Sequence, residues 1–326
     1  MKQCPLRPFT LALAVSVLFA SGPAARAAES GFPTKPIRIV QGFSIGGISD
    51  TIARIVGDEL SKRVGQPVVV EARAGAGGIV GMTSVQSSPH DGYTLLLGNA
   101  VITIAGNKQD KPPFDPMKAF VPVSMIGTAP SVLMSHPSFP VRGLKELIAF
   151  AKKRPGDVDC ATSGVGTSND LAVHLLNHMG AIKLNTVPYK GSGPSITAAL
   201  SGETPLSFGP LLPAIPHVKE GRLRGLGVSG LERTPTLPDV PAIAEVLPGY
   251  EAVGFYSIVA PQGVPQPVVE RLHKEINVVL GIPQVRQRLE SQGMDVAVMS
   301  RKEFADFLVR DADRWSTLVQ AAGLKF

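Results

Sequence analysis

Short apolar segments alternate with helices along this chain, and that order restricts the fold more than any other feature. In the first half, strands are expected at 37–40, 67–71 and 93–97. The first helix between them begins near Ser49, a good N-cap residue, and ends at Gly65. Alternating strands and helices predict a parallel sheet with right-handed crossovers.

A second strand–helix series follows a helix expected at 142–153. Its strands are expected at 158–161, 186–189, 205–208 and 226–228. A chain of 326 residues exceeds one typical core, which favours two lobes.

Two long extended stretches fix where the lobes meet, near 125–135 and 250–260. We therefore expect lobe 1 to comprise 28–130 and 253–326, and lobe 2 to comprise 131–252. The predicted fold class is α/β, with two parallel-sheet lobes and a ligand cleft between them.

The N-terminus has the layout of a secretory signal peptide. Lys2 and Arg7 precede an apolar run over 9–20, and Ala25-Arg26-Ala27 gives a small-residue cleavage pattern. The run is too short to span a bilayer core of roughly 30 Å. We expect residues 1–27 to be a signal peptide and the protein to be periplasmic.

The charge balance and the cysteines exclude several classes. Without residues 1–27 the chain keeps 29 of its 32 basic residues against 26 acidic ones, a net charge of about +3. No basic run with interleaved aromatics remains, so nucleic-acid binding is not expected. Cys160 is then the only cysteine, so an intramolecular disulfide is impossible. We expect Cys160 to be a small core residue rather than a nucleophile.

One loop matches the nucleophile elbow of α/β-hydrolases. Gly42-Phe43-Ser44-Ile45-Gly46 reads G-x-S-x-G and lies between a strand and a helix. It follows the first strand, however, whereas the hydrolase fold needs several strands before its nucleophile. An exported serine hydrolase using Ser44 is kept as the enzyme alternative, and no catalytic residue is assigned.

Two further patterns suggest sites but fit them poorly. Gly75–Gly81 misses the G-x-G-x-x-G register because Val80 replaces the third glycine, so no dinucleotide cofactor is expected. Asp170, His174 and His178 share a helix face, but ligands at i and i+8 lie about 12 Å apart. No metal is expected.

Three small-residue loops that each lead into a helix carry the main functional signal. They cover Phe43–Asp50, Thr162–Asp170 and Lys190–Ser195. In a parallel sheet such loops lie at the carboxyl ends of the strands, where ligands bind. Free backbone N–H groups at a helix start attract anions, so the loops predict a carboxylate-binding cleft.

The chain also resembles Bug-type receptors, the periplasmic solute-binding components of tripartite tricarboxylate transporters. The matching motifs run through nearly the whole chain after the signal peptide. They are Phe32-Pro-Thr-Lys-Pro-Ile37, Gly65-Gln-Pro-Val-Val-Val-Glu71, Gly75-Ala-Gly-Gly78, Pro89-His-Asp-Gly-Tyr-Thr-Leu-Leu-Leu-Gly98, Val187-Pro-Tyr-Lys-Gly191, Pro216-His-Val-Lys-Glu-Gly221 and Leu237-Pro-Asp-Val-Pro241.

The resemblance implies a type II periplasmic-binding-protein fold that closes by a hinge on its ligand. The partners implied are a small carboxylate or amino-acid-like ligand and membrane transporter subunits; we expect a monomer. A receptor that presents its ligand to a sensor kinase remains an alternative. The expected ligand-binding residues are Phe43, Ser44, Ile45, Gly46, Gly47, Ile48, Ser49, Asp50, Ser163, Gly164, Val165, Gly166, Thr167, Ser168, Asn169, Asp170, Tyr189 and Lys190.

The first loop departs from the family pattern F-A-P-G-G-G-T-D, since Ile45 and Ile48 replace a proline and a glycine. Asp170 stands where histidine is common, and Gly209-Pro210 replaces Asp-Asn. An acid in the cleft would disfavour a second carboxylate. These departures lead us to expect a monocarboxylate or an amine-bearing ligand.

Overall fold

The computed structural model describes residues 31–107 and 113–321. From Pro33 onward, the described residues form one compact unit. The expected signal peptide, 1–27, lies outside the described residues.

The first sheet has six strands in the order β11-β4-β10-β3-β1-β2. Their bounds are β1 Ile37–Gln41, β2 Val68–Ala72, β3 Thr94–Asn99, β4 Phe120–Ala129, β10 Gly254–Pro261 and β11 Asp295–Val296. The β1 strand is buried except at Arg38, and it pairs in parallel with both β2 and β3. The three strands expected in the first half are therefore confirmed.

The second sheet has five strands in the order β7-β6-β8-β5-β9. Their bounds are β5 Ser131–Ser135, β6 Asp159–Thr162, β7 Asn185–Pro188, β8 Leu206–Pro210 and β9 Arg224–Val228. β6 pairs in parallel with β7 and β8. The strands expected in the second half are present within a residue or two.

Both sheets contain the predicted parallel pairs, and each also contains antiparallel strands. β5 runs antiparallel to β8 and β9, and β10 runs antiparallel to β3 and β4. β5 and β10 are the strands by which the chain enters a different sheet. β5 follows directly after Pro130, and β10 follows residues 229–253, which contain turns and the 3₁₀ turn Ile243–Glu245. An antiparallel strand needs no helical crossover.

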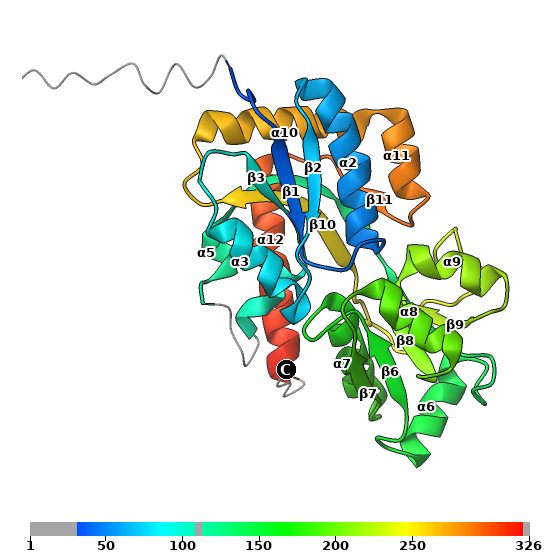
Figure 1. The fold of residues 1–326 in the computed structure, drawn as a ribbon. Helices are drawn as coiled ribbons and strands as arrows, with labels where there is room; N and C mark the ends of the chain where they lie inside the picture. Colours follow the sequence, from blue (N-terminus) through cyan, green and yellow to red (C-terminus); the bar gives the residue numbers. More distant parts are fainter. Residues whose placement is uncertain (1–30, 108–112, 322–326) are drawn as a thin grey trace, which may run out of the picture. The chain divides into compact units, whose positions relative to one another are not determined.

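Helices accompany both sheets, and Figure 1 shows α2, α10 and α11 close to one another beside the first sheet. The helices of this part are α2 Ile48–Val64, α3 Ile79–Gln86, α4 Val101–Ile104, α5 Pro116–Ala119, α10 Gln266–Gly281, α11 Pro283–Glu290 and α12 Arg301–Ala321. Those of the second sheet are α6 Leu144–Lys153, α7 Ser168–Gly180, α8 Ser192–Ser201 and α9 Leu211–Lys219. Short 3₁₀ turns lie at Ala76–Gly78, Ala105–Asn107 and Ile243–Glu245.

Local sequence explains where several helices begin and end. Gly65 closes α2 in the left-handed conformation, with φ of 70°. The last helix begins with a capping box: Ser300 N donates to Glu303 Oε2 at 2.8 Å, and Glu303 N donates to Ser300 Oγ at 3.2 Å. At α2 the prediction was wrong, because Gly47 is the N-cap and Ser49 lies inside the helix.

The chain passes between the sheets twice. Pro130 separates β4 from β5, and residues 229–253 lead from β9 back to β10. The returning segment is tied down, since Ala252 N donates to Ser229 O at 2.9 Å and Tyr250 Oη donates to Ala172 O at 2.8 Å. These two passages place residues distant in sequence beside one another.

The main hydrophobic core contains side chains from both sheets. Leu96 and Phe255 of the first sheet and Leu133 and Phe208 of the second belong to one buried cluster, together with Trp315 of α12. A smaller cluster fills the space between α9 and the second sheet. Among the described residues, no helix is both long and apolar enough to cross a membrane.

Candidate functional site

A cavity lies between the starts of α2 and α7, and we call it the inner cavity. It holds about 580 Å³ of space free of protein atoms, part of it open to solvent. The first sheet and its helices contribute Phe43, Gly47, Ile48, Ser49, Asn99, Ala100, Val101, Ala129, Gly254, Phe255 and Tyr256. The second contributes Ser131, Ser163, Thr167, Ser168, Asn169, Ser192 and Pro210.

The loop before α2 is braced by Asp50. Gly46, with φ of 78°, donates its N–H to Asp50 Oδ2 at 3.2 Å. Arg54 reaches the same carboxylate with two hydrogen bonds, of 3.0 and 3.1 Å. The N-cap residue of α2 is Gly47, which has no side chain. The first N–H groups of the helix therefore receive no side-chain cap.

The loop before α7 is braced in the same way by Asp170. Gly166, with φ of 66°, donates its N–H to Asp170 Oδ2 at 2.9 Å, and Thr162 Oγ1 donates to Oδ1 at 3.2 Å. Here the N-cap residue Thr167 accepts a hydrogen bond from Asp170 N at 3.3 Å. Asp170 is 2% exposed, and its carboxylate accepts hydrogen bonds from the loop itself.

A buried polar network forms the wall of the inner cavity on the side of α7. Asn169 Nδ2 donates to Ser163 Oγ at 2.8 Å, and Ser131 Oγ donates to Asn169 Oδ1 at 2.6 Å. Ser131 is fixed in turn because its N–H donates to Ser229 Oγ at 2.8 Å. Three segments of the chain therefore hold one amide side chain in a defined orientation.

The opposite wall comes from β3, α4 and β10. Asn99 Oδ1 accepts from Val101 N at 3.0 Å and shapes the start of α4. Tyr256 hydrogen-bonds with the Ser49 side chain, and burial raises the pKa of Tyr256 well above its usual value. Tyr256 is therefore a neutral hydroxyl at the start of α2.

The inner cavity favours an anion without supplying a charged partner. Among the described residues that line it, no side chain carries a charge. The starts of two long helices, α2 and α7, contribute residues to the same space. Backbone N–H groups at helix starts bind carboxylates, and hydroxyl and amide groups add donors.

A second cavity adjoins the first, and we call it the outer cavity. It holds about 570 Å³ and also opens to solvent. The glycine loop Gly75–Gly78, with Gly42 and Phe43, forms one side, and Ser163–Val165 with Pro188–Lys190 forms the other. Phe43 and Ser163 line both cavities.

The structure distributes the predicted site residues among three places. Those that line the inner cavity are Phe43, Gly47, Ile48, Ser49, Ser163, Thr167, Ser168 and Asn169. Those that line the outer cavity are Phe43, Ser163, Gly164, Val165, Tyr189 and Lys190. Those that line neither are Ser44, Ile45, Gly46, Asp50, Gly166 and Asp170.

The position of Asp170 corrects the argument about ligand charge. Its carboxylate accepts hydrogen bonds from its own loop and lines neither cavity. The expected repulsion of a second ligand carboxylate by Asp170 therefore has no basis in this structure. Pro210, by contrast, lines the inner cavity as part of the altered Gly209-Pro210 pair.

Sequence reasoning missed the walls formed by β3, α4 and the ends of β4, β5 and β10 next to the passages between the sheets. These residues are Asn99, Ala100, Val101, Ala129, Ser131, Gly254, Phe255 and Tyr256. Five of them, Ala129, Ser131, Gly254, Phe255 and Tyr256, lie in the stretches 125–135 and 250–260. The lobes were expected to meet there, so these residues could have been predicted. Ser192 also lines the inner cavity; it belongs to the third small-residue loop, Lys190–Ser195, but is not among the expected ligand-binding residues.

Ser44 has none of the partners that a hydrolase nucleophile needs. Its Oγ is buried and, among the described residues, has no hydrogen-bond partner. It lies so close to Gly191 that a Cβ atom there would be 2.6 Å from Ser44 Oγ. A serine nucleophile requires a base within hydrogen-bonding distance, so the geometry does not support a hydrolase.

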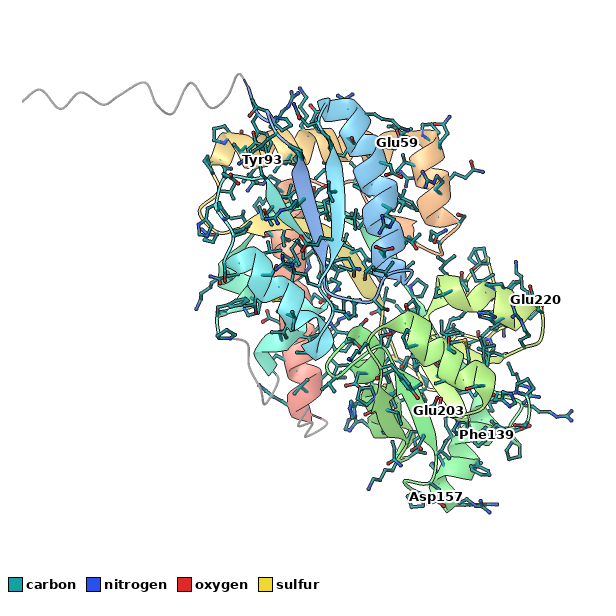
Figure 2. The ribbon with its side chains drawn as sticks, viewed as in Figure 1. Glu59, Tyr93, Phe139, Asp157, Glu203 and Glu220 are labelled. Carbon is teal, nitrogen blue, oxygen red and sulfur yellow. The ribbon has the colours of Figure 1, made fainter. Side chains whose placement is uncertain are left out.

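The structure also shows the environment of Cys160 and Tyr189 and tests for a metal-binding cluster. Cys160 is fully buried in the core, and burial raises the pKa of its thiol. Burial, and then the hydrogen bond to Glu203, raises the pKa of Tyr189 to about 12; Figure 2 labels Glu203. In the part of the chain that the structure describes, no group of three metal-ligating side chains occurs.

Comparison with known sequences identifies relatives over nearly the whole chain. The family described as "Tripartite tricarboxylate transporter family receptor" matches residues 52–324. Protein BugT of Bordetella pertussis is 32% identical, covering 97% of this chain and 98% of its own length. The protein of the tcbD-tcbE intergenic region of a Pseudomonas species is 36% identical, covering 88% and 86%.

Solved structures give the same result. The periplasmic binding protein BugD superposes with a TM-score of 0.86 at 29% identity, covering 90% of this chain and 99% of its own. The R. palustris protein Rpa4515, solved with adipate, gives the same values. MatC from Rhodopseudomonas palustris, solved with bound malate, has a TM-score of 0.82 at 29% identity, covering 88% of this chain and 100% of its own.

Proposed function

This chain belongs to the tripartite tricarboxylate transporter receptor family, and on that basis we propose that it captures a small carboxylate in the inner cavity. The family is one of periplasmic solute-binding receptors, and the fold is that of periplasmic binding proteins. The protein would deliver its ligand to membrane transporter subunits. The signal peptide over 1–27 would direct its export.

One observation carries the proposal: the starts of α2 and α7 supply residues to a single cavity without a charged side chain. Such a cavity holds a carboxylate through backbone N–H groups and neutral donors, because the helix starts already carry partial positive charge. Two relatives of the same fold were solved with adipate and with malate. The hydrolase and sensor alternatives gain no support from these comparisons.

We also propose that the two sheets mark two lobes, 28–130 with 253–326 and 131–252, which close around the ligand. The passages at Pro130 and at residues 229–253 would act as the hinge. The close approach of the two loops supports this, since a Cβ atom added to Gly164 would lie within 3.5 Å of Gly77 Cα. The receptor would act as a monomer.

A thermal-shift screen of the mature protein, unfolded and refolded to remove any carried-over ligand, tests the carboxylate proposal. A carboxylate at about 100 times its dissociation constant should add about 2.7 kcal/mol to the unfolding free energy. We expect a clear rise in melting temperature with one group of carboxylic acids. Stabilisation by neutral sugars or by amines alone would contradict the proposal, as would no shift with any carboxylate.

A matched pair of variants places that binding in the inner cavity. A Cβ at Gly47 would lie 3.3 Å from Ser192 Oγ, so Gly47→Val fills the cavity at the start of α2. The same substitution at Gly281 enters open space. We expect Gly47→Val to abolish the shift and Gly281→Val to keep it. Equal shifts in both variants would place the ligand elsewhere.

A further inference from the structure

The loop before α2 and the loop before α8 are in close contact. A Cβ atom on Gly191 would lie 2.6 Å from Ser44 Oγ, and one on Gly47 would lie 3.3 Å from Ser192 Oγ. The first loop follows β1 of the first sheet, and the second follows β7 of the second sheet. The contact between the loops therefore depends on how closely the two sheets approach each other.

Ser44 brings a hydroxyl group into this contact. Its Oγ is buried, and among the described residues it has no hydrogen-bond partner. Gly191 has no side chain to offer one, and its φ of 126° favours glycine at this position. The hydroxyl lies against bare backbone, in the space where a side chain on Gly191 would begin.

The other polar side chains of the two loops differ from Ser44. Within the described loop residues 43–47 and 190–195, Ser44 Oγ is the only buried side-chain oxygen without a hydrogen-bond partner. Ser195 Oγ, for example, donates to Ser192 O at 3.0 Å. The unpaired hydroxyl is thus a feature of the contact between the two loops and not of the loops in general.

Ser44 also differs from the residues that would hold a ligand, because it lines neither the inner nor the outer cavity. Its neighbour Ile45 is 73% exposed, so this part of the loop borders solvent. When the two loops separate, water reaches the Ser44 hydroxyl. When they meet, the hydroxyl loses that water and gains no partner, which costs free energy.

We infer that the Ser44 hydroxyl opposes closure of the two lobes and so lowers the affinity for every ligand without contacting any of them. The cost of burying the hydroxyl arises at each closure, whatever the cavity holds. The unliganded protein therefore favours the open arrangement, in which a ligand can enter, and the apparent affinity falls with the fraction that is closed. The inference rests on the lobe closure proposed above and not on the nature of the ligand.

Distances between the lobes test the inference without a ligand. Asp58→Cys on α2 and Lys219→Cys on α9 place spin labels at two exposed positions, beside different sheets (Figure 1). Cys160 is fully buried and should stay unlabelled. Double electron–electron resonance on the refolded mature protein then gives the fractions of short and long distances.

Two substitutions of Ser44 should move these fractions in opposite directions. Ser44→Ala removes the hydroxyl and should raise the short-distance fraction of the unliganded protein. Ser44→Leu should remove that fraction, because a larger side chain would collide with the backbone of Gly191. An unchanged distance distribution in Ser44→Ala would overturn the inference.

Calorimetric titration with malate and with adipate measures the consequence for binding. We expect Ser44→Ala to tighten both acids by the same factor, about fivefold, and Ser44→Leu to weaken both. The control Ser87→Ala removes an exposed hydroxyl that lines neither cavity and should change neither affinity. Weaker binding by Ser44→Ala would overturn the inference, because it would show that the hydroxyl holds the ligand.

The outcomes separate this inference from the carboxylate proposal. If the distances do not respond to Ser44→Ala, the inference is overturned while carboxylate binding can stand. If the distances respond but no carboxylate binds, the carboxylate proposal is overturned and the inference stands. Unchanged circular dichroism spectra of the variants would show that the fold is intact.

Discussion

The loops before α2 and α7 have the same backbone arrangement, although their sequences differ. Gly46 and Gly166 both have positive φ, and each donates its N–H to an aspartate four residues later. Each loop is closed by a further backbone bond, from Gly47 N to Ser44 O at 3.3 Å and from Thr167 N to Gly164 O at 3.2 Å. The aspartates thus brace the loops, and neither carboxylate lines the inner cavity.

The loops differ in how deeply the brace is buried and in what caps the helix. Gly46 is exposed and Asp50 has Arg54 as its partner, whereas Gly166 is buried and the corresponding position, His174, lies 3.8 Å from Asp170. Only α7 has a side-chain cap. The loop before α2 is therefore stabilised by an exposed arginine, and its N–H groups are open to water. The loop before α7 is stabilised by buried hydrogen bonds within the protein.

The largest expected effect comes from deleting each brace. Asp170→Ala leaves the buried Gly166 N–H and Thr162 hydroxyl without their acceptor, which should cost about 2–3 kcal/mol of unfolding free energy. Asp50→Ala should cost about 1 kcal/mol, because water can reach the exposed Gly46 N–H. Urea denaturation of both variants measures the two costs. Equal costs would break the comparison.

A middle-sized effect is expected at the cap. Thr167→Ala removes the side-chain acceptor of Asp170 N and should cost about 1 kcal/mol. Thr167→Ser retains the hydroxyl and should recover most of the loss. Urea denaturation of both variants measures their unfolding free energies. If Thr167→Ala were as stable as the native protein, the start of α7 would be no better fixed than that of α2.

The smallest effect is expected at Arg54, whose side chain is 52% exposed. Arg54→Ala should lower the unfolding free energy by at most about 1 kcal/mol at low salt, and by less at high salt, because exposed ion pairs are screened. Melting temperatures at low and high sodium chloride compare the two conditions. A large loss that salt does not change would show that Arg54 acts through packing rather than charge.

Much of the local structure could be predicted from the sequence, because it depends on neighbours along the chain. The β1 and β6 strands, the helices after their glycine-rich loops and the Ser300–Glu303 capping box follow from apolar runs, small residues and capping patterns. The loops themselves could be recognised as helix starts, with free N–H groups suited to an anion. The resemblance to Bug-type receptors pointed to the same cleft.

The rest of the site could not be predicted because it depends on which segments meet in space. Ser131 and Asn169 are far apart in sequence, yet their hydrogen bond forms one wall of the inner cavity. Tyr256 reaches Ser49 only because β10 enters the first sheet antiparallel to β3 and β4. The direction of such a strand is set by packing against its neighbours, not by its own residues.

At Asp170, a single residue, one part of its role follows from the sequence and another part only from the tertiary structure. The sequence by itself determined that an acid stands four residues after a glycine at the start of α7, and that α7 begins there. Only the tertiary structure decided that the carboxylate turns under its loop, toward Gly166 and Thr162, rather than into the cleft. The reason is physical: a buried carboxylate must find donors, and those donors lie beneath the loop.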